Sequence, residues 1–323
     1  MADKQALNAT FFAFRKREKG GVLTMTTIAY AVLSVAMLTL FAWLNWQGIS
    51  DYIGWIATFS TSAGKIDPND PNAMAQMMPP ASVMALGPSY LLALLGVYVL
   101  FAAYEAACLR WMIRGETGGI FGLSLGADTW RVYFGYWIWF FIFLAAYLVF
   151  VMLTFGLVGG VVLAAQGNPD SAGPGALIGF LLMLVAGLAW IWLCVRLSPA
   201  AATSVARRRF AFFDAWKVSK GRFWALFGAF LLLWIMYVVL CIVASVAVGA
   251  VMGITVMSQM TQAGPQTAEE AMRMFASPSV LIPMAAMYGV MIVAAFTLYV
   301  AMFGVNARAA AQALEEGKIA AAT

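Results

Sequence analysis

Six long stretches of this chain contain no Asp, Glu, Lys or Arg, and each is longer than the roughly 20 apolar residues that a helix needs to cross a lipid bilayer. The runs are continuously apolar and lack the apolar/polar alternation of a membrane β-barrel, so they predict helices rather than strands. The charge-free windows are Gly20–Ser50, Pro71–Tyr104, Val132–Pro169, Ser171–Val195, Phe223–Ala268 and Met274–Ala307.

The composition agrees with lipid as the solvent of these windows. Only 10% of the residues are charged and the mean hydropathy is +0.87, whereas a soluble domain carries about 25% charged residues. We therefore expect one all-α integral membrane domain over residues 1–323. The third and fifth spans are longer than one upright helix requires, so each begins as an interfacial helix or crosses at a tilt. The spans are placed near residues 21–46, 84–108, 134–164, 175–196, 224–256 and 280–306.

The cations are distributed unequally between the two ends of the spans. Of the 19 Lys and Arg residues, all except Lys65 and Arg273 fall before span one, after span six, or in the loops that join spans two to three and four to five. The positive-inside bias therefore places both termini and these two loops in the cytoplasm. The first apolar run, of about 26 residues, is too long for a signal-peptide core, so we expect an uncleaved anchor. Together these features predict a multi-pass membrane protein with its N- and C-termini in the cytoplasm.

The two basic loops repeat each other at an offset of 86 residues. The triplet Cys108–Arg110 falls on Cys194–Arg196, and the segment Asp128–Val132 falls on Asp214–Val218. A fainter third copy, "FFAFRKREKGG", stands before span one. The chain is therefore expected to contain three tandem helical hairpins, each beginning with an aromatic–basic interfacial segment. The repeat units cover about residues 10–108, 126–196 and 212–308.

The aromatic–basic segments have the composition of a membrane interface. Trp rings prefer the headgroup zone, and anionic lipid attracts each Lys or Arg near the surface by about 1 kcal/mol. The second segment is expected to lie along the membrane surface and to turn into span five near Gly221. Two interpretations of these segments remain open. They are either a plain membrane anchor, or a specific site that binds a lipid headgroup, such as that of an anionic lipid, or a protein partner. The candidate residues are Trp130, Arg131, Trp216, Lys217, Lys220 and Arg222.

The sequence lacks the residues that most catalytic sites and metal sites need. The chain has no histidine, which excludes a His general base, a Ser–His–Asp triad and His metal ligation, and it has no GxxxxGK[ST] phosphate loop. The three cysteines, Cys108, Cys194 and Cys241, form no CxxC pair and are expected to be packing residues. We expect no metal, no cofactor and no nucleic-acid partner.

Methionine is the remaining candidate for metal binding, because thioethers are soft ligands for Cu(I). Two short methionine clusters occur, but no Cys or His ligand accompanies them. We therefore expect these side chains to fill gaps in the packing rather than to bind copper. The clustered methionines are Met74, Met77, Met78, Met257 and Met260.

Glu105 is an acid embedded in an apolar helix, near the cytoplasmic end of span two. Ionisable residues inside membrane helices are costly, so they usually face a partner or a cavity. Arg110 is poorly placed on the same helix for a direct pair, whereas Arg196 or Arg308 can reach Glu105 from a neighbouring helix. A structural ion pair and a proton- or substrate-coupling carboxylate both remain open. A further hypothesis is that Arg110, Arg196 and Arg308 line a basic vestibule on the cytoplasmic side.

G-x-x-x-G spacing occurs in three spans and lets helix backbones approach closely, either within one bundle or between two copies of the chain. On the outer side, Gln266–Ala276 begins with a capping box, Thr267 and Glu270, and predicts a short helix. The segment "SDYIGWIATF" after span one is also expected at the outer surface. The glycine pairs are Gly156 with Gly160, Gly175 with Gly179, and Gly249 with Gly253.

The segments "AACLRWMIRGE…FGLSLGADTWRV" and "FAFFDAWKVSKGRFWALFGAFLLL", together with the six spans, resemble a broad set of bacterial inner-membrane proteins. These are the YciC-type family and the membrane domain fused to some glycerophosphodiester phosphodiesterases. The resemblance covers most of the chain as an architecture and only the two segments as sequence. It implies the fold, a Gram-negative source and a location in the bacterial inner (cytoplasmic) membrane. It supplies no catalytic residues, and no hydrolase function follows from it.

Three classes of function remain after these exclusions. The first is a non-enzymatic protein that acts as a scaffold or accessory of a membrane assembly or of lipid organisation. The second is a transporter or channel for a small or lipid-like solute, which the internal repeats and Glu105 favour. The third, an intramembrane enzyme, lacks a cluster of polar residues. We expect the first class, with membrane lipids and a protein partner or a second copy of the chain as binding partners.

Overall fold

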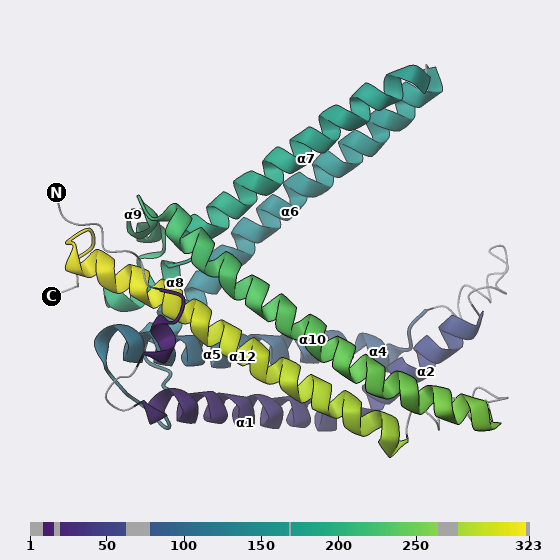
Figure 1. The fold of residues 1–323 in the computed structure, drawn as a ribbon, viewed down its shortest axis with the longest axis horizontal. Coiled ribbons are helices and arrows are strands. Elements are labelled where there is room, and N and C mark those ends of the chain that lie inside the picture. Colours follow the sequence, from purple (N-terminus) through teal and green to yellow (C-terminus); the bar gives the residue numbers. More distant parts are fainter. Residues whose placement is uncertain (1–8, 16–19, 63–77, 168, 264–276, 321–323) are drawn as a thin grey trace. The chain divides into compact units, whose positions relative to one another are not determined.

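Six long helices dominate the computed structural model, which describes residues 9–15, 20–62, 78–167, 169–263 and 277–320 (Figure 1). Within these ranges there is no β-strand, and the six helices are long and apolar enough to cross a membrane. The chain is therefore an all-α multi-pass membrane protein, as the charge-free windows predict. The long helices are α1 (Gly21–Leu44), α5 (Leu86–Arg114), α6 (Ala127–Gly167), α7 (Pro169–Leu197), α10 (Phe223–Ala263) and α12 (Pro278–Glu315).

Several shorter helices connect or cover the ends of the long ones. The segment "SDYIGWIATF" lies within one of them, α2, and the expected helix Gln266–Ala276 falls outside the described residues, as do Met74 and Met77. The shorter elements are η1 (Phe12–Phe14), α2 (Trp46–Ser62), α4 (Ala81–Met84), α8 (Ala200–Ala206), η2 (Phe212–Asp214) and α9 (Ala215–Ser219).

Five of the six long helices are longer than the spans that the sequence predicts, and α1 is two residues shorter. α5 continues to Arg114 and α12 to Glu315, so Arg110 and Arg308 lie on helices rather than in loops. α6 and α10 have 41 residues each. At 1.5 Å per residue each is about 60 Å long, about twice the thickness of the hydrocarbon core of a bilayer. Both helices therefore extend beyond the hydrocarbon or cross it at a tilt.

Apolar side chains cover the outside of the long helices. Leu92 on α5, Phe155 on α6 and Ile254 on α10 are each more than 70% exposed. In water such a surface would be strongly unfavourable, whereas lipid tails solvate it as well as a protein core would. The surface of the spans therefore matches a lipid environment.

The chain separates into two compact units, which we describe one at a time. The smaller unit consists of Lys19–Ala107 and Thr117–Phe134, and the larger one of Met1–Glu18, Cys108–Glu116 and Gly135–Thr323. The expectation of one domain over the whole chain stays a prediction.

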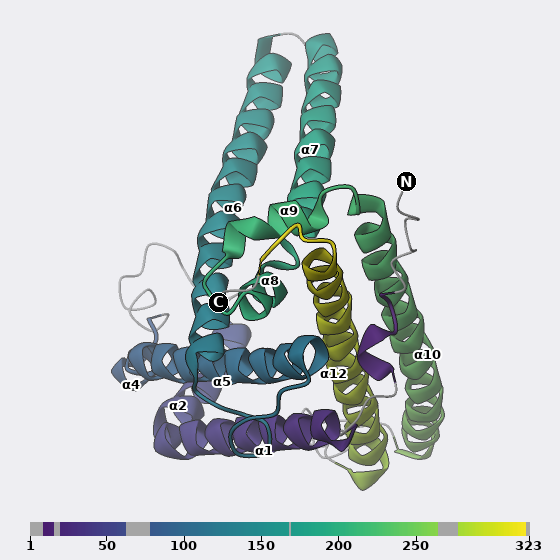
Figure 2. The same cartoon turned by 90° about the vertical axis from the view of Figure 1, so that its left-hand side faces the viewer.

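In the smaller unit α1 lies beside α5 (Figures 1 and 2). Tyr30 stacks on Tyr104 with ring centroids 4.6 Å apart, and the Thr27 and Tyr104 hydroxyl oxygens are 2.9 Å apart. At the other end of these helices α2 packs on α4, where the Ser82 hydroxyl donates a 2.6 Å hydrogen bond to the Asp51 carboxylate. Polar contacts at both ends therefore fix the register of the α1–α5 hairpin.

A tight loop, residues 117–126, joins α5 to α6 and is attached to α1. The Thr26 hydroxyl donates a 2.9 Å hydrogen bond to the Phe121 carbonyl oxygen, and Phe121 has a positive φ of 53°. Gly122 has φ 88°, and a Cβ there would lie 2.4 Å from the Thr26 hydroxyl oxygen. Only glycine fits this position without a shift of Thr26 or of the loop.

In the larger unit α10 and α12 run side by side, and both views show α6 beside α7 (Figures 1 and 2). A core of small and branched residues, including Leu226, Leu233 and Val305, joins α10 to α12. Between α6 and α7, Leu157 occupies the space where a Cβ on Gly179 would lie. Four other glycines of the expected G-x-x-x-G pairs have open space among the described residues, with nothing within 4 Å of where a Cβ would stand. They are Gly156, Gly160, Gly249 and Gly253.

The two aromatic–basic segments have similar side-chain environments. In both, the Asp forms an ion pair with the cation three residues later, Asp128 with Arg131 at 2.6 Å and Asp214 with Lys217 at 2.9 Å. Both valines of the repeat, Val132 and Val218, are fully buried. This likeness supports the tandem repeats, which stay a prediction.

The two segments differ in how they meet the following span. Trp130 and Arg131 lie in the first turns of the continuous helix α6, whereas Trp216 and Lys217 lie on a separate helix, α9. The break follows from the backbone, because Gly221 adopts φ 78° between α9 and α10. Its repeat mate Gly135 is helical within α6. The turn expected near Gly221 is present, and the first copy has no counterpart of it.

Candidate functional site

Short helices and helix ends of the larger unit gather into a compact structure, which we call the collar (Figure 2). We define the collar as η1, the end of α5 as far as Glu116, the last turn of α7 and the residues after it as far as Arg222, and the last turn of α12 and the residues after it as far as Lys318. It therefore contains α8, η2 and α9. Its interior is rich in alanine and small polar residues, with Ala202, Thr203 and Ala309 fully buried. A Cβ on Gly304 would lie 2.7 Å from Ala13, so η1 approaches the α12 backbone closely.

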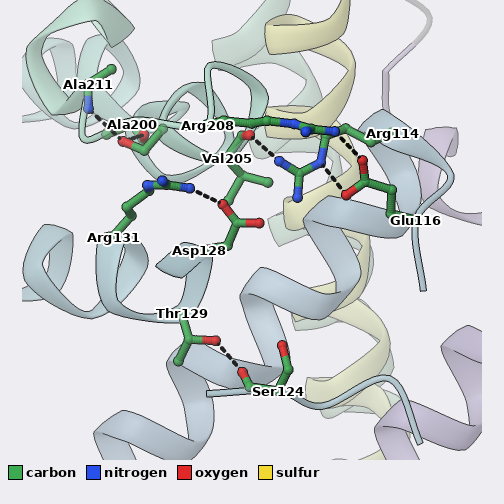
Figure 3. A network of polar contacts seen from close by, with 11 residues as sticks. Arg114, Glu116, Ser124, Asp128, Thr129, Arg131, Ala200, Val205, Arg208 and Ala211 are labelled. Atoms are coloured by element: carbon green, nitrogen blue, oxygen red, sulfur yellow. Dashed lines mark hydrogen bonds and ion pairs between the residues drawn. The ribbon is translucent and has the colours of Figure 1, made fainter. Parts of the chain in front are cut away.

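Three carboxylates bring the cations of the collar together. The first is Glu116, which lies between the guanidinium groups of Arg114 and Arg208 (Figure 3). Its distance to Arg114 Nε is 3.1 Å, and Arg114 Nη1 also donates a 3.0 Å hydrogen bond to the Val205 carbonyl oxygen. Glu116 therefore links the end of α5 to α8 and the residues after it.

Asp214 and Glu316 are the other two bridging carboxylates. A hydrogen bond from Lys217 lowers the pKa of Asp214, and the nearby charge of Arg207 acts in the same direction. A hydrogen bond from Lys318 likewise lowers the pKa of Glu316, which also pairs with Arg222. Both carboxylates are ionised at neutral pH, and each holds two or more cations in place.

Aromatic rings hold two further arginines of the collar. The Arg196 guanidinium carbon lies 5.7 Å from the ring centroids of both Trp192 and Trp216. The Arg308 guanidinium lies 5.7 Å from the Phe12 ring, and its Nη1 is 3.6 Å from Glu315. Cation–π contacts of this kind contribute about 0.5–2 kcal/mol each.

The structure places the expected polar residues in separate environments. Glu105 and Arg110 are 7% and 8% exposed on α5, so both are buried, as expected for ionisable groups in a membrane helix. Arg196 and Arg308 stack on different rings, and neither lines one of the two grooves described below. The shared vestibule stays a prediction.

The candidate interfacial residues divide into exposed and internally paired groups. Trp130 and Trp216 are 43% and 39% exposed, and Lys220 is exposed. Arg222 is different, because its side chain is only 11% exposed and pairs with Glu316. Arg131 and Lys217 each pair with an Asp on the same helix or the preceding turn. The positive charge of these segments is therefore partly neutralised by neighbouring carboxylates.

Two apolar grooves open on the long helices. One, of about 920 Å³, lies in the smaller unit between α1, α5 and the loop 117–126. The other, of about 510 Å³, lies in the larger unit between η1, α10 and α12. Apolar side chains form nearly all of both linings, so neither groove resembles a path for an ion or a polar solute.

Sequence reasoning did not single out Glu116, Glu316 or Trp192. The three-residue spacing of Asp214 and Lys217 in the sequence indicates that they can pair. Glu116 and Arg208 are 92 residues apart, so nothing local in the sequence indicates their contact. The described residues contain no group of three or more His, Cys, Asp or Glu side chains that could hold a metal ion. Comparison with family models, with curated proteins and with solved structures finds no match for this chain.

Proposed function

We propose that this chain is a non-enzymatic multi-pass protein of a bacterial inner membrane that organises phospholipid around its collar and supports a membrane assembly. The positive-inside bias of the sequence places the collar and both termini at the cytoplasmic surface. There its arginines and lysines meet the anionic lipids of the inner leaflet.

The observation that carries this proposal is the arrangement of charge. The polar side chains of the collar bind one another in acid-centred clusters around Glu116, Asp214 and Glu316. The two grooves on the spans are apolar. Cations that are paired within the collar, together with apolar grooves on the spans, suit a scaffold better than a solute pathway, since a pathway needs polar groups in the span.

Lipid analysis tests this role. The full-length protein is extracted into native nanodiscs with styrene–maleic acid, and its phospholipids are compared with those of the whole membrane. We expect anionic phospholipid to be enriched around the protein. A lipid composition equal to that of the bulk membrane contradicts lipid organisation.

A transporter or channel is the second candidate, because Glu105 is buried at 7% exposure within an apolar helix. Proteoliposomes with imposed proton, potassium or chloride gradients separate the two roles. The proposed function predicts no flux above that of empty liposomes, for both wild type and Glu105→Gln. Flux that wild type supports and Glu105→Gln abolishes establishes the transporter and overturns the scaffold.

A further inference from the structure

Among the collar cations that are at least partly buried, Arg196 stands out because no carboxylate of the described residues pairs with it. It lies at the end of α7, and its Nε and Nη1 atoms are buried without a hydrogen-bond partner in the described part of the chain. Arg207, Arg222 and Arg308 have side chains that are 10–17% exposed, and each of them pairs with an acid. Arg196 is therefore a partly buried cation with two buried N–H groups that no described acceptor satisfies.

The surroundings of Arg196 leave its hydrogen-bonding edge unsatisfied. The Trp192 and Trp216 rings pack edge to face, with centroids 5.0 Å apart and an interplanar angle of 85°. The guanidinium sits 5.7 Å from each ring. Aromatic rings stabilise the positive charge but accept no conventional hydrogen bond from the N–H groups. Leaving such donors buried and unpaired is costly, so the site favours an anion that accepts two hydrogen bonds side by side.

The position of the site indicates which anion that is. Trp192 and Trp216 are 41% and 39% exposed, as is typical of rings at the headgroup level. Leu188 and Ile191, just before Trp192 on α7, are exposed apolar residues of the span. A ligand at Arg196 thus continues directly into the lipid-facing surface of α7. The ligand that combines a phosphate with an apolar tail is a phospholipid.

We infer that Arg196, Trp192 and Trp216 form a specific binding site for the phosphate of one inner-leaflet phospholipid. On binding, the exposed Trp rings shift aside, so that the guanidinium donates a pair of hydrogen bonds from its otherwise buried Nε and Nη1 atoms to two phosphate oxygens. The acyl chains follow Leu188 and Ile191 along α7. This inference rests on the proposed function in one respect, which is that lipid lies at the collar. It differs from that function because it concerns one stoichiometric binding site rather than a general enrichment of anionic lipid.

Native mass spectrometry of the full-length protein in detergent tests the site. The protein is titrated with dioleoyl phosphatidylglycerol, with dioleoylglycerol, which has the same tails and no phosphate, and with inorganic phosphate as a competitor. For wild type we expect one phosphatidylglycerol to be retained in preference to dioleoylglycerol. Arg196→Gln is expected to weaken this binding about tenfold, the loss of one strong charge-assisted interaction.

Matched variants separate charge from geometry. Arg196→Lys keeps the charge but loses the planar fork, so we expect it to bind with intermediate affinity. Trp216→Phe is expected to weaken binding as well. Arg209→Gln removes an exposed collar cation, and Trp224→Phe alters a ring that is 78% exposed on α10. Both control variants are expected to bind like wild type.

Circular dichroism of each variant confirms folding. If Arg196→Gln does not fold, Arg196→Lys and Trp216→Phe decide the question. Wild-type affinity in the folded Arg196 variants overturns the inference. So does displacement of the lipid by an equal concentration of inorganic phosphate, because the site then selects free phosphate. A discrete Arg196-dependent lipid without general anionic enrichment supports the site while contradicting the wider function, so the two failures are distinguishable.

Discussion

The Asp214 carboxylate lies close to three cations of the collar. It contacts Arg207 and Lys217 directly, and Arg209 lies 3.9 Å away. These cations favour the ionised carboxylate, and the pKa of Asp214 is lowered as a result, first by the hydrogen bond from Lys217. Because the ionised form is the one the fold prefers, protonation of Asp214 weakens the attachment of η2 and α9 to α8.

The sign of the pH effect follows from the lowered pKa. Asp214 stabilises the fold above the pKa of an unfolded aspartate, about 3.9, and this contribution is lost as the pH falls through the lower folded value. We expect Asp214→Asn to reduce the melting temperature in detergent at neutral pH by about 2–4 °C, since partly exposed ion pairs contribute about 1 kcal/mol. The variant is also expected to lose less stability than wild type below about pH 4.

Glu315→Gln is the control for this experiment, because Glu315 is 63% exposed and lies 3.6 Å from Arg308. Thermal melts followed by circular dichroism from neutral to acidic pH give the comparison. Equal acid sensitivity of Asp214→Asn and wild type contradicts a stabilising role for the Asp214 carboxylate.

At the scale of single residues, the sequence carries a visible signal only where that signal is local. The position of Trp216 and Lys217 within one short motif was visible, and so was the apolar environment of Glu105. The contact of Arg196 with Trp216 was not, because it depends on how α7 packs against α9. The same holds for Glu116, whose partner Arg208 comes from a distant part of the chain. Long-range charge pairing has no signature in a single sequence.

At the scale of elements, the loop 117–126 depends on two glycines, Gly119 and Gly122, of which Gly122 contacts α1. Gly122 combines φ 88° with a clash at 2.4 Å for any added Cβ. We expect Gly122→Ala to destabilise the protein by about 2 kcal/mol, through backbone strain and loss of the Thr26–Phe121 hydrogen bond. Denaturant unfolding in mixed micelles measures the change in free energy.

Gly118→Ala is the matched control, because it lies in the same loop and a Cβ there meets nothing within 4 Å among the described residues. We expect its unfolding free energy to equal that of wild type within about 0.5 kcal/mol. Destabilisation of the same size in both variants contradicts a specific role for the close approach of Gly122 to Thr26.

Helices were the easiest elements to predict and their breaks the hardest. Continuous apolar runs identified all six spans, since backbone groups in lipid must bond within the helix. The same motif nevertheless gives a separate helix at α9 and a continuous one at α6. Ser219 and Lys220 precede the glycine in one copy, whereas Tyr133 and Phe134 precede it in the other. The Ser219 hydroxyl donates a hydrogen bond to the Trp216 carbonyl oxygen where α9 ends, whereas Tyr133 and Phe134 continue the helix in α6.

At the scale of the whole molecule, the topology is open to a direct labelling test. Cysteines are introduced singly at Lys220, an exposed collar residue, and at Met78, which is 72% exposed before α4. The background variant replaces Cys108, Cys194 and Cys241 with alanine. A membrane-impermeant maleimide is expected to label position 78 in spheroplasts, and position 220 only after the membrane is opened, because the cations lie inside.

Labelling of both positions in detergent-solubilised membranes shows that each thiol is reactive. Reaction of position 220 in closed spheroplasts reverses the proposed orientation and moves the collar to the outer face. The phospholipid site at Arg196 then faces the outer leaflet, so this experiment also fixes the membrane leaflet from which the lipid comes.

The exposed length of α6 has a mechanical consequence. Its most apolar 18-residue window contains no buried residue, and the helix has 41 residues. A long apolar helix with few protein contacts adjusts its angle to the local bilayer, at a cost of fractions of a kcal/mol per ångström of mismatch. Thinner membranes therefore lay α6 flatter and thicker ones raise it. Near its N-terminal end α6 packs against η2 through Trp139 and Phe212. We therefore expect a change in bilayer thickness to change the angle between the α6–α7 hairpin and the collar.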